Sequence, residues 1–272
     1  MSEAFETIEK SIRKQRSTYY GKYRAFVADN QDPDGLGRIR LTVPSVLGEA
    51  TSDWALPAVA YGGGADFGML FVPPVGAQVL AEFLEGDVSA PVWAATFWRQ
   101  GSEVPGEYQG PSTKILKTES GHLLTFEDKE GDEQITLRSA AEADVVMDSG
   151  GSIVLTDKGG AHVALDAEAG EIRIEDANGN SILLSSNGIT CKDASGNEIT
   201  TDAGGVVVKS SAVVSIEGSQ VTVAGAGGEP LVKGTTFLSL FNAHTHATGV
   251  GPSSPPIVPL TPTVLTTKST AQ

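Results

Sequence analysis

The sequence predicts an all-β protein built as an N-terminal OB-fold barrel followed by an intertwined β-helix (β-prism) of several chains that forms a needle. Two observations carry this prediction. Short apolar-alternating segments broken by Gly and Pro fill the first third, and pairs of apolar residues recur through the second half. The composition agrees, because 32 Gly, 14 Pro and only 6% aromatic residues suit many turns and short strands.

The N-terminal region supplies the strands of a small closed barrel. Alternating or apolar segments lie at residues 21–29, 38–43, 54–61, 68–72, 75–84 and 92–98. The run Asp32-Pro-Asp-Gly35 is typical of a turn between the first two strands. Five or six strands in fewer than 80 residues fit a barrel of the OB type over residues 21–98.

The second half repeats one pattern eleven times: two apolar residues at positions i and i+2, every 7–10 positions, with a polar residue between them in six of the eleven pairs. The pairs are Ile135/Leu137, Val145/Met147, Ile153/Leu155, Val163/Leu165, Ile172/Ile174, Ile182/Leu184, Ile189/Cys191, Ile199/Thr201, Val206/Val208, Val214/Ile216 and Val221/Val223, with Thr201 as the one exception. Alternate side chains of a strand point to opposite faces, so each pair is expected to face inward.

Turn-forming residues such as Gly150-Gly151 and Asn178-Gly179 separate these pairs, with no helical segment between them. The pattern predicts a ladder of very short strands. Because one chain brings only two apolar residues per strand to this face, we expect several chains to wind together around the apolar stripe. A rigid rod of this kind indicates a mechanical or adhesive role rather than catalysis.

The remaining segments complete five predicted parts: an N-terminal helical arm at 1–20, the barrel at 21–98, a linker at 99–114, the needle at 115–223, and a tip segment with a Pro-rich tail at 224–272. Phe5, Ile8 and Ile12 recur at helical spacing in the arm, which either packs on its own domain or serves as a docking arm. Residues 235–242 are expected to form one or two helical turns.

Charge and cysteine content limit the function. The net charge of −15 argues against sequence-independent nucleic-acid binding, which requires Lys and Arg clusters. Cys191 is the single cysteine and occupies an inward position, so it is expected to be a small buried apolar residue. The first residues show neither a signal peptide nor a membrane span, so synthesis in the cytoplasm is expected.

The order of barrel, linker and ladder resembles the central spike proteins of contractile tails. This family includes phage baseplate assembly protein V, the spikes of R-type pyocins and related injection systems and, more distantly, the Val-Gly-repeat spikes of type VI secretion. The residues that carry the resemblance are 21–44, 54–57, 71–79, 83–87 and 91–93 in the barrel, 120–128 with 133–137 at the start of the ladder, and Asn242-Ala-His-Thr-His246 with Gly249-Val-Gly-Pro252 near the end.

The resemblance implies a homotrimer whose needle caps the tail tube and pierces the target cell envelope, assembled into the baseplate of a virion or injection particle. It implies tail tube or hub proteins and baseplate components as partners, with a tip-capping protein as a further candidate. Some relatives carry a lysozyme domain between barrel and needle, but here 16 residues separate Trp98 from Ile115, so no such enzyme fits.

His244 and His246 are the candidate metal ligands. In an extended backbone positions i and i+2 point the same way, so three chains would bring six imidazoles to a threefold axis. Six nitrogen donors suit an octahedral first-row metal, and we expect one structural iron ion per trimer. The alternative is two exposed loop histidines. His122 and His162 are expected to be structural and solvated, respectively.

Other functions fit less well. No nucleophile–base or paired-carboxylate arrangement stands out, so we expect no enzymatic activity. The turn at residues 30–41 imitates an EF-hand loop, but Leu41 stands where a bidentate Glu is required. A trimeric β-helical adhesin or tail fibre that binds surface glycans is the alternative function. Phe126 is the only aromatic residue from Ile115 to Val223, which disfavours sugar stacking. A β-solenoid lyase or hydrolase would need longer strands.

Overall fold

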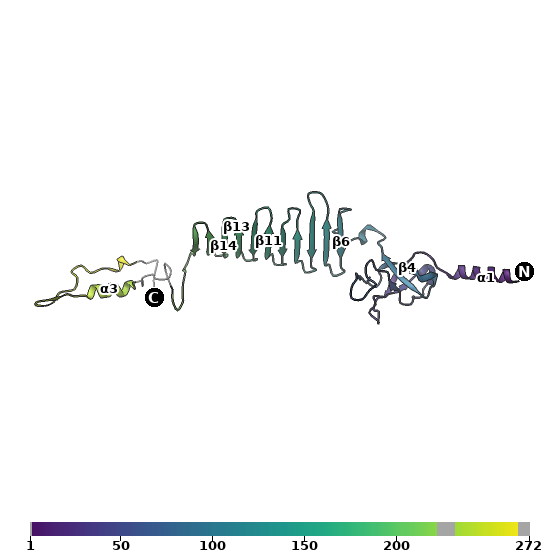
Figure 1. The fold of residues 1–272 in the computed structure, drawn as a ribbon, viewed down its shortest axis with the longest axis horizontal. Helices are drawn as coiled ribbons and strands as arrows, with labels where there is room; N and C mark the ends of the chain where they lie inside the picture. Colours follow the sequence, from purple (N-terminus) through teal and green to yellow (C-terminus); the bar gives the residue numbers. More distant parts are fainter. Residues whose placement is uncertain (1, 222–231, 266–272) are drawn as a thin grey trace.

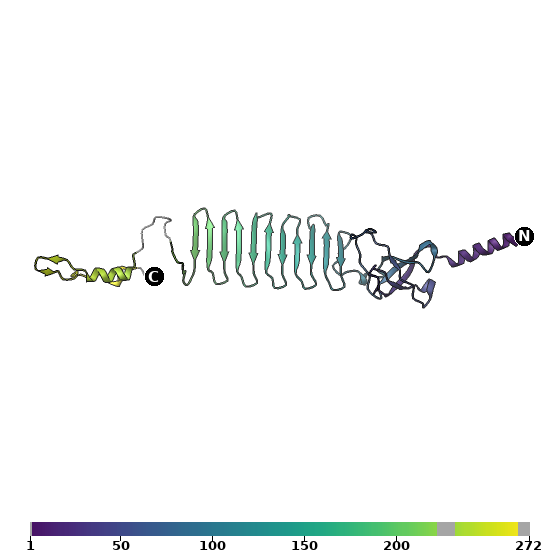
Figure 2. The ribbon, with the colours of Figure 1, turned by 60° about the horizontal axis from the view of Figure 1, so that its bottom comes forward.

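The computed structural model describes residues 2–221 and 232–265. The molecule is elongated, and its parts follow one another along the long axis (Figures 1 and 2). Helix α1 (Ser2–Ser17) lies at one end, followed by a compact β domain, a long ladder of strands and a hairpin-ended tip segment. The predicted N-terminal helix is therefore present.

The N-terminal domain is a closed five-stranded barrel. Its strands are β1 (Tyr23–Asp29), β2 (Arg40–Thr42), β3 (Leu56–Pro57), β4 (Gln78–Phe83) and β5 (Pro91–Thr96), in the order β2-β1-β4-β5-β3, with α2 (Pro44–Leu47) after β2 and η1 (Leu84–Gly86) after β4. Reciprocal backbone hydrogen bonds between Ile39 and Ala55, of 3.2 and 2.8 Å, join the two outer segments. This bridge closes the sheet into the barrel that the sequence predicts.

The barrel buries its own core within one chain. Ile39, Leu41, Val43 and Val79 are completely inaccessible to solvent, and Trp93 packs against them while its indole nitrogen donates to the Gly37 carbonyl at 3.2 Å. These residues come from alternate positions of β2, β4 and β5, as strand geometry requires. The barrel strands therefore bury this core without a second copy.

The Asp32 turn forms as predicted and uses its carboxylate internally. Asp32 accepts hydrogen bonds from the backbone N–H groups of Asp34, Leu36 and Arg38 and from the Arg38 guanidinium. The bond from Arg38 is the main reason why the pKa of Asp32 lies well below its usual range. The carboxylate is thus occupied by its own turn.

One predicted barrel strand is wrong. Residues 68–72 form no strand but belong to a long loop between β3 and β4. Gly62, Gly63 and Gly68 adopt positive φ angles and Pro73-Pro74 follow, which interrupts regular pairing. The apolar side chains of this segment led to the prediction, but Phe67, Leu70 and Phe71 are largely exposed.

The ladder is one sheet of eleven antiparallel strands that follow one another in sequence order. Helix η2 (Gly101–Glu103) precedes them. The strands are β6 (Thr113–Lys117), β7 (Leu123–Glu127), β8 (Gln134–Arg138), β9 (Asp144–Met147), β10 (Ile153–Thr156), β11 (His162–Asp166), β12 (Glu171–Glu175), β13 (Ser181–Ser185), β14 (Gly188–Lys192), β15 (Glu198–Asp202) and β16 (Gly205–Lys209). Each strand pairs with its neighbours in the same chain, so one chain satisfies the ladder hydrogen bonds between these strands.

Nine of the eleven predicted apolar pairs lie in these strands and in one register. Leu137 is opposite Val145, Ile174 opposite Ile182, and Cys191 opposite Ile199. Directly opposed residues of an antiparallel pair point to the same face, so the pairs share one face of the sheet, as predicted.

The ladder stops earlier than the sequence suggests. Val214 and Ile216 are not in a strand. Val213 and Val214 instead line a cavity with Ile199 and Val208, so this segment lies beside the apolar face rather than extending the sheet. In the last predicted pair, Val221 is not in a strand and Val223 lies outside the described residues.

Six hairpin turns of the ladder use one five-residue design. A Thr, Ser or Asp at the first position accepts a hydrogen bond from the backbone N–H four residues later; these first residues are Thr118, Ser139, Asp148, Asp157, Asp176 and Asp193. The fourth residue has a positive φ angle and is Gly in five of the turns, whereas Glu142 occupies it in the sixth. This is the turn chemistry expected for short hairpins.

Neighbouring turns on the same edge are also joined to one another. His122 Nδ1 accepts from the Ala140 N–H, and Asn180 Oδ1 accepts from the Ala194 N–H, both at 3.1 Å. Each of these two bonds joins a turn to the next turn on the same edge, which lies two strands further along the ladder. The edge of the ladder is therefore bonded lengthwise, which opposes bending of the rod.

The tip segment folds back on itself. Helix α3 (Gly234–Ala243) leads to a hairpin of β17 (Ala247–Thr248) and β18 (Gly251–Pro252), and the chain returns through η3 (Pro262–Val264). Asn242 exchanges two hydrogen bonds of 2.9 Å with the backbone of Leu260, which holds the returning chain against α3. The predicted short helix is thus longer than expected.

Candidate functional site: an apolar sheet face and a histidine tip

The apolar face of the ladder consists of two continuous rows of side chains. One row runs through Leu116, Leu124, Leu137, Val145, Leu155, Val163, Ile174, Ile182, Cys191, Ile199 and Val208, and the other through Phe126, Ile135, Met147, Ile153, Leu165, Ile172, Leu184, Ile189, Thr201 and Val206. The apolar pairs predicted from the sequence begin at Ile135, but Leu124 and Phe126 of β7 show the same i, i+2 spacing and extend both rows.

This face is open in the single chain. Leu137 is 56% exposed, Ile174 43% and Ile199 48%, although each belongs to a regular strand. An apolar surface of this length is far beyond the isolated exposed residues normal for a soluble protein. The two rows are therefore a surface that requires a partner.

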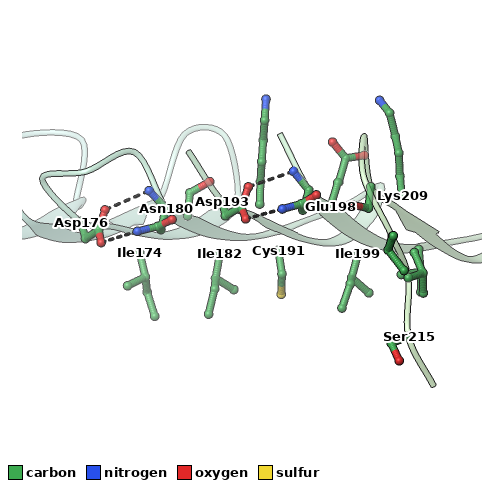
Figure 3. Close-up of a pocket in the computed structure, with 17 residues that line it drawn as sticks. Ile174, Asp176, Asn180, Ile182, Cys191, Asp193, Glu198, Ile199, Lys209 and Ser215 are labelled. Atoms are coloured by element: carbon green, nitrogen blue, oxygen red, sulfur yellow. Dashed lines mark hydrogen bonds between the residues drawn. The ribbon is translucent and has the colours of Figure 1, made fainter. Parts of the chain in front are cut away.

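Figure 3 shows part of this face from the side. Ile174, Ile182, Cys191 and Ile199 project in one direction from four successive strands, whereas the turn residues Asp176, Asn180 and Asp193 lie along the edge. These side chains border a shallow cavity of about 710 Å³. The cavity is open along the apolar row, so it is part of the uncovered face rather than an enclosed ligand pocket.

The opposite face is polar along its margins. Arg138 faces Asp144 across two strands, with a guanidinium–carboxylate distance of 3.3 Å, and His162 lies opposite Glu175. Arg173 is on this face between Ala164 and Leu183, so the predicted strand phase is correct. The apolar face thus carries two rows of apolar side chains, whereas the opposite face has polar groups at its margins and a central row that mixes Arg173 with apolar residues such as Val154, Ala164 and Leu183.

The structure brings His244 and His246 together directly after α3. Their ring centroids are 5.2 Å apart, and His244 is 5.0 Å from the ring of Phe241. His244 Nδ1 lies at hydrogen-bonding distance from the Phe241 carbonyl, and because a carbonyl can only accept, this contact is a hydrogen bond in the tautomer with its proton on Nδ1. In that tautomer the Nε2 lone pair of His244 is free to bind a metal ion.

The two histidines lie in a segment that otherwise has no ionisable side chains. Residues 234–265 contain no Asp, Glu, Lys or Arg, so the histidines are the ionisable side chains of this segment. Ser253 fixes the backbone of His246 from the returning chain, through bonds of 2.7 and 2.8 Å. Within the described residues, one chain gathers no cluster of three or more potential metal ligands.

The other predicted positions have structural roles. His122 accepts the turn-to-turn hydrogen bond described above, and His162 lies on the polar face. Cys191 is a partly buried free thiol in the apolar row. In the parts of the chain that the structure covers, no helix is long and apolar enough to cross a membrane.

Comparison with known proteins identifies the barrel. Residues 23–98 match a family model described as the type VI secretion system/phage-baseplate injector OB domain. This range contains all five barrel strands and the residues that close the barrel. The fold and the family model therefore agree on the same segment of the chain.

Curated relatives point the same way. The chain is 29% identical over 125 residues to type VI secretion system spike protein VgrG3 of Vibrio cholerae, covering 42% of this chain and 12% of that protein. It is 33% identical over 108 residues to spike protein VgrG5 of Pseudomonas aeruginosa, covering 36% and 14%. It is 28% identical over 126 residues to the actin cross-linking toxin VgrG1 of Vibrio cholerae, covering 43% and 11%.

These matches span only a small part of each curated relative, so they compare one region rather than whole proteins. The injector OB domain coincides with the barrel described above. Residues 23–98 therefore match the injector OB domain of phage baseplates and type VI secretion systems, and the chain is similar to spike proteins VgrG3 and VgrG5 over 42% and 36% of its length.

Proposed function

We propose that this protein is the homotrimeric central spike of a contractile tail or injection system, which caps the tail tube and pierces the target cell envelope. The observation that carries the proposal is the uncovered apolar face of the ladder. A sheet with two exposed rows of aliphatic side chains along its length is stable in water only when other copies cover it.

The dimensions of the sheet favour three copies. Strands of five residues are about 17 Å long, at about 3.4 Å per residue. In an equilateral prism with sides of about 17 Å, the axis lies about 5 Å from each face, or half of the ~10 Å spacing of packed sheets. Three such sheets would fill the interior with their apolar side chains and place their polar faces outward.

The proposed role is the transmission of force. Each ladder satisfies its own strand-to-strand hydrogen bonds, and the turn-to-turn bonds of His122 and Asn180 run lengthwise. Association would add a buried apolar interior to three sheets that are already bonded. A rod of this kind resists bending, as a needle pushed through an envelope must.

The family supports the proposed location and partners. The barrel would sit in the baseplate against tail tube or hub proteins and other baseplate components, with the needle projecting away from them; a tip-capping protein is a further partner. VgrG3 and VgrG5 are named as spike proteins, whereas the toxin activity in the name of VgrG1 belongs to that protein. We assign no enzymatic activity and no nucleic-acid partner to this chain.

The trimer is tested by light scattering and by the reactivity of Cys191. In a trimer the thiol should face the interior and react slowly with a soluble disulfide reagent. A matched control carries Thr190→Cys with Cys191→Val, because Thr190 lies on the opposite face and should react fast. A well-folded monomer, or equal reaction rates at the two positions, would contradict the trimeric needle.

The separate roles proposed for the barrel, which joins the baseplate, and for the needle, which pierces the envelope, are tested in assembled particles. Deletion of residues 113–272 removes the ladder and tip but leaves the barrel with its complete core. Such particles should still incorporate the shortened protein and should fail to inject. If the shortened protein is not incorporated, the barrel is not the part that joins the baseplate.

We further propose that His244 and His246 of three copies hold one iron ion on the threefold axis. The free Nε2 of His244, the adjacent ring of His246 and the lack of charged side chains at residues 234–265 support the fit. Six imidazole nitrogens suit an octahedral first-row metal. The ion would supply a structural cross-link between three tips.

Elemental analysis of protein purified without a polyhistidine tag tests the metal. One iron per three chains is expected, and it should be absent from the His244→Ala/His246→Ala variant. His122→Ala is the control, since His122 belongs to a ladder turn and should leave the metal content unchanged. Metal at one per chain, or metal retained in the double variant, would contradict the axial site.

A further inference from the structure

Helix α1 carries an apolar stripe that the described part of its own chain leaves uncovered. Phe5, Ile8 and Ile12 are 70%, 55% and 43% exposed. Among the described helices and strands, none makes an extensive contact with α1. The sequence left two alternatives for this helix, and the structure does not pack it on its own domain.

The stripe has the spacing of a coiled-coil seam. Phe5, Ile8 and Ile12 are separated by three and then four residues, which corresponds to a, d and a positions of a heptad. The residues between them that fall outside these positions, Glu6, Thr7, Glu9, Lys10 and Ser11, are polar. A seam of this width fits another helix of the same kind better than the broad surface of a globular domain, because a core-facing helix has a wider apolar face.

The position of α1 in the molecule indicates that its apolar stripe is covered by the same helix of other copies. Both views place the helix at the end of the long molecule opposite the β17–β18 hairpin, roughly along the long axis (Figures 1 and 2). Three chains that align their ladders side by side would bring three α1 helices together, parallel and in register. In a parallel arrangement an e position lies opposite the preceding g position of the neighbouring helix, which is Ala4 here, so Glu9 at e does not face a like charge.

From the spacing, the exposure and the axial position together, we infer that α1 of three copies forms a short parallel three-helix coiled coil at the tube-proximal end of the spike. This inference rests on the proposed trimer. A 16-residue helix is marginal alone in water, but attachment to a trimer raises the local concentration of its partners to the millimolar range. The coiled coil would hold the three N-termini on the axis.

Disulfide trapping in the full-length chain tests this arrangement. In a Cys191→Val background, Ile8→Cys places a thiol in the seam, and Lys10→Cys places one on the outer side of the same helix at the f position. Mild oxidation of dilute protein should cross-link two chains of each Ile8→Cys trimer about tenfold or more faster than chains of Lys10→Cys. Ile12→Cys repeats the test at an a position.

The outcomes separate the two proposals. If light scattering shows a trimer but the Ile8→Cys and Ile12→Cys variants do not cross-link, the inferred coiled coil is wrong, whereas the proposed trimeric spike is supported. If Lys10→Cys cross-links as fast as Ile8→Cys, the helices lie close without the inferred seam, and the inference also fails. If the chain is monomeric, the trimeric spike itself is wrong.

Discussion

The barrel and the ladder are both built from short strands, but they handle their apolar residues in opposite ways. The barrel curves until the segment before β3 meets β2, so Leu41 and Val79 are fully buried in one chain. The ladder stays open, and residues such as Leu137 and Ile199 remain about half exposed. A closed sheet can fold alone, whereas an open sheet with an apolar face depends on association.

The largest expected effect is on association of the chains, and it comes from placing a charge on the apolar face of the ladder. Ile174→Asp would bring an unpaired carboxylate from each of three copies to the needle interior, at a cost of several kcal/mol per copy, and should abolish association. Arg173→Asp is the neighbouring change on the polar face and should leave the trimer intact. Light scattering distinguishes the variants.

The barrel should not respond to Ile174→Asp. All three tryptophans, Trp54, Trp93 and Trp98, belong to the barrel region, so tryptophan fluorescence reports on the barrel alone. Its unfolding transition should stay in place while the circular dichroism of the ladder changes. Equal effects of Ile174→Asp and Arg173→Asp on association would mean that the face has been assigned wrongly.

The next-largest expected effect is a loss of stability caused by a backbone clash within the ladder. A Cβ at Gly188 would lie 1.8 Å from the Thr201 carbonyl oxygen, so Gly188→Ala should force β14 and β15 apart and cost at least about 3 kcal/mol. Gly160 also has a positive φ angle but has open space around its Cβ position. Gly160→Ala should cost only about 1–2 kcal/mol.

Thermal unfolding followed by circular dichroism measures both glycine variants, with tryptophan fluorescence as the record of an unchanged barrel. If Gly160→Ala destabilises the ladder as much as Gly188→Ala does, backbone conformation alone explains the loss and the close approach of β14 to Thr201 is not the cause.

Acid should affect the two regions in different pH ranges. Hydrogen bonds from the Asn180 side chain and backbone lower the pKa of Asp176 to about 2, and Asn197 likewise lowers that of Asp193. Since these folded-state pKa values lie below the ordinary value of 3.8, the turns contribute stability above that pH and lose it as the pH falls towards 2. Asp32 should keep its contribution to lower pH than Asp176, because its pKa is lowered further.

Unfolding measured between pH 5 and pH 2 should therefore show the ladder signal weakening before the tryptophan signal. The Asp176→Asn/Asp193→Asn variant should lose stability at neutral pH and show a flatter pH dependence of the ladder. A double variant with the same pH dependence as the original protein would exclude these two turns as the acid-sensitive groups.

The smallest expected effect concerns the one hairpin that departs from the common design. Glu142 adopts a φ angle of 68° where five equivalent turns have Gly. Glu142→Gly should relieve the strain, and the greater freedom of Gly in the unfolded chain offsets part of the gain, so a net stabilisation of about 1 kcal/mol or less is expected. The ion pair of Glu142 with Lys158, at 3.9 Å and well exposed, contributes little to this balance.

A small rise in the melting temperature of the ladder, with no change in the barrel, would agree with this expectation. A fall would show that the side chain of Glu142 stabilises its turn by more than the backbone strain costs.

Much of the ladder could be predicted because its signal is local. A strand of five residues with two apolar side chains on one face can be recognised from alternation alone. No distant contact is needed to decide that Ile172 and Ile174, or Ile182 and Leu184, share a face of the sheet. The same local pattern also covered Val214 and Ile216, where it failed. Whether a segment joins the end of a sheet depends on its neighbours as well as on its own alternation.

The candidate site was only partly accessible from the sequence. The i, i+2 spacing of His244 and His246 predicted that the two rings would lie together, and they do. The contact of His244 Nδ1 with the Phe241 carbonyl depends on the end of α3, and the support from Ser253 depends on a chain that returns from beyond the hairpin. Neither contact leaves a signal in the spacing of the histidines.

The strand phase of the ladder, the apolar row that holds Cys191 and the turn at Asn178-Gly179 could be predicted from the sequence, because alternation and turn chemistry act over a few neighbouring residues. The closure of the barrel by Ile39 and Ala55, the exclusion of residues 68–72 from it and the return of the chain along α3 to Leu260 became visible only in the three-dimensional structure. These outcomes depend on contacts between segments far apart in the chain, whose free energy no local pattern records.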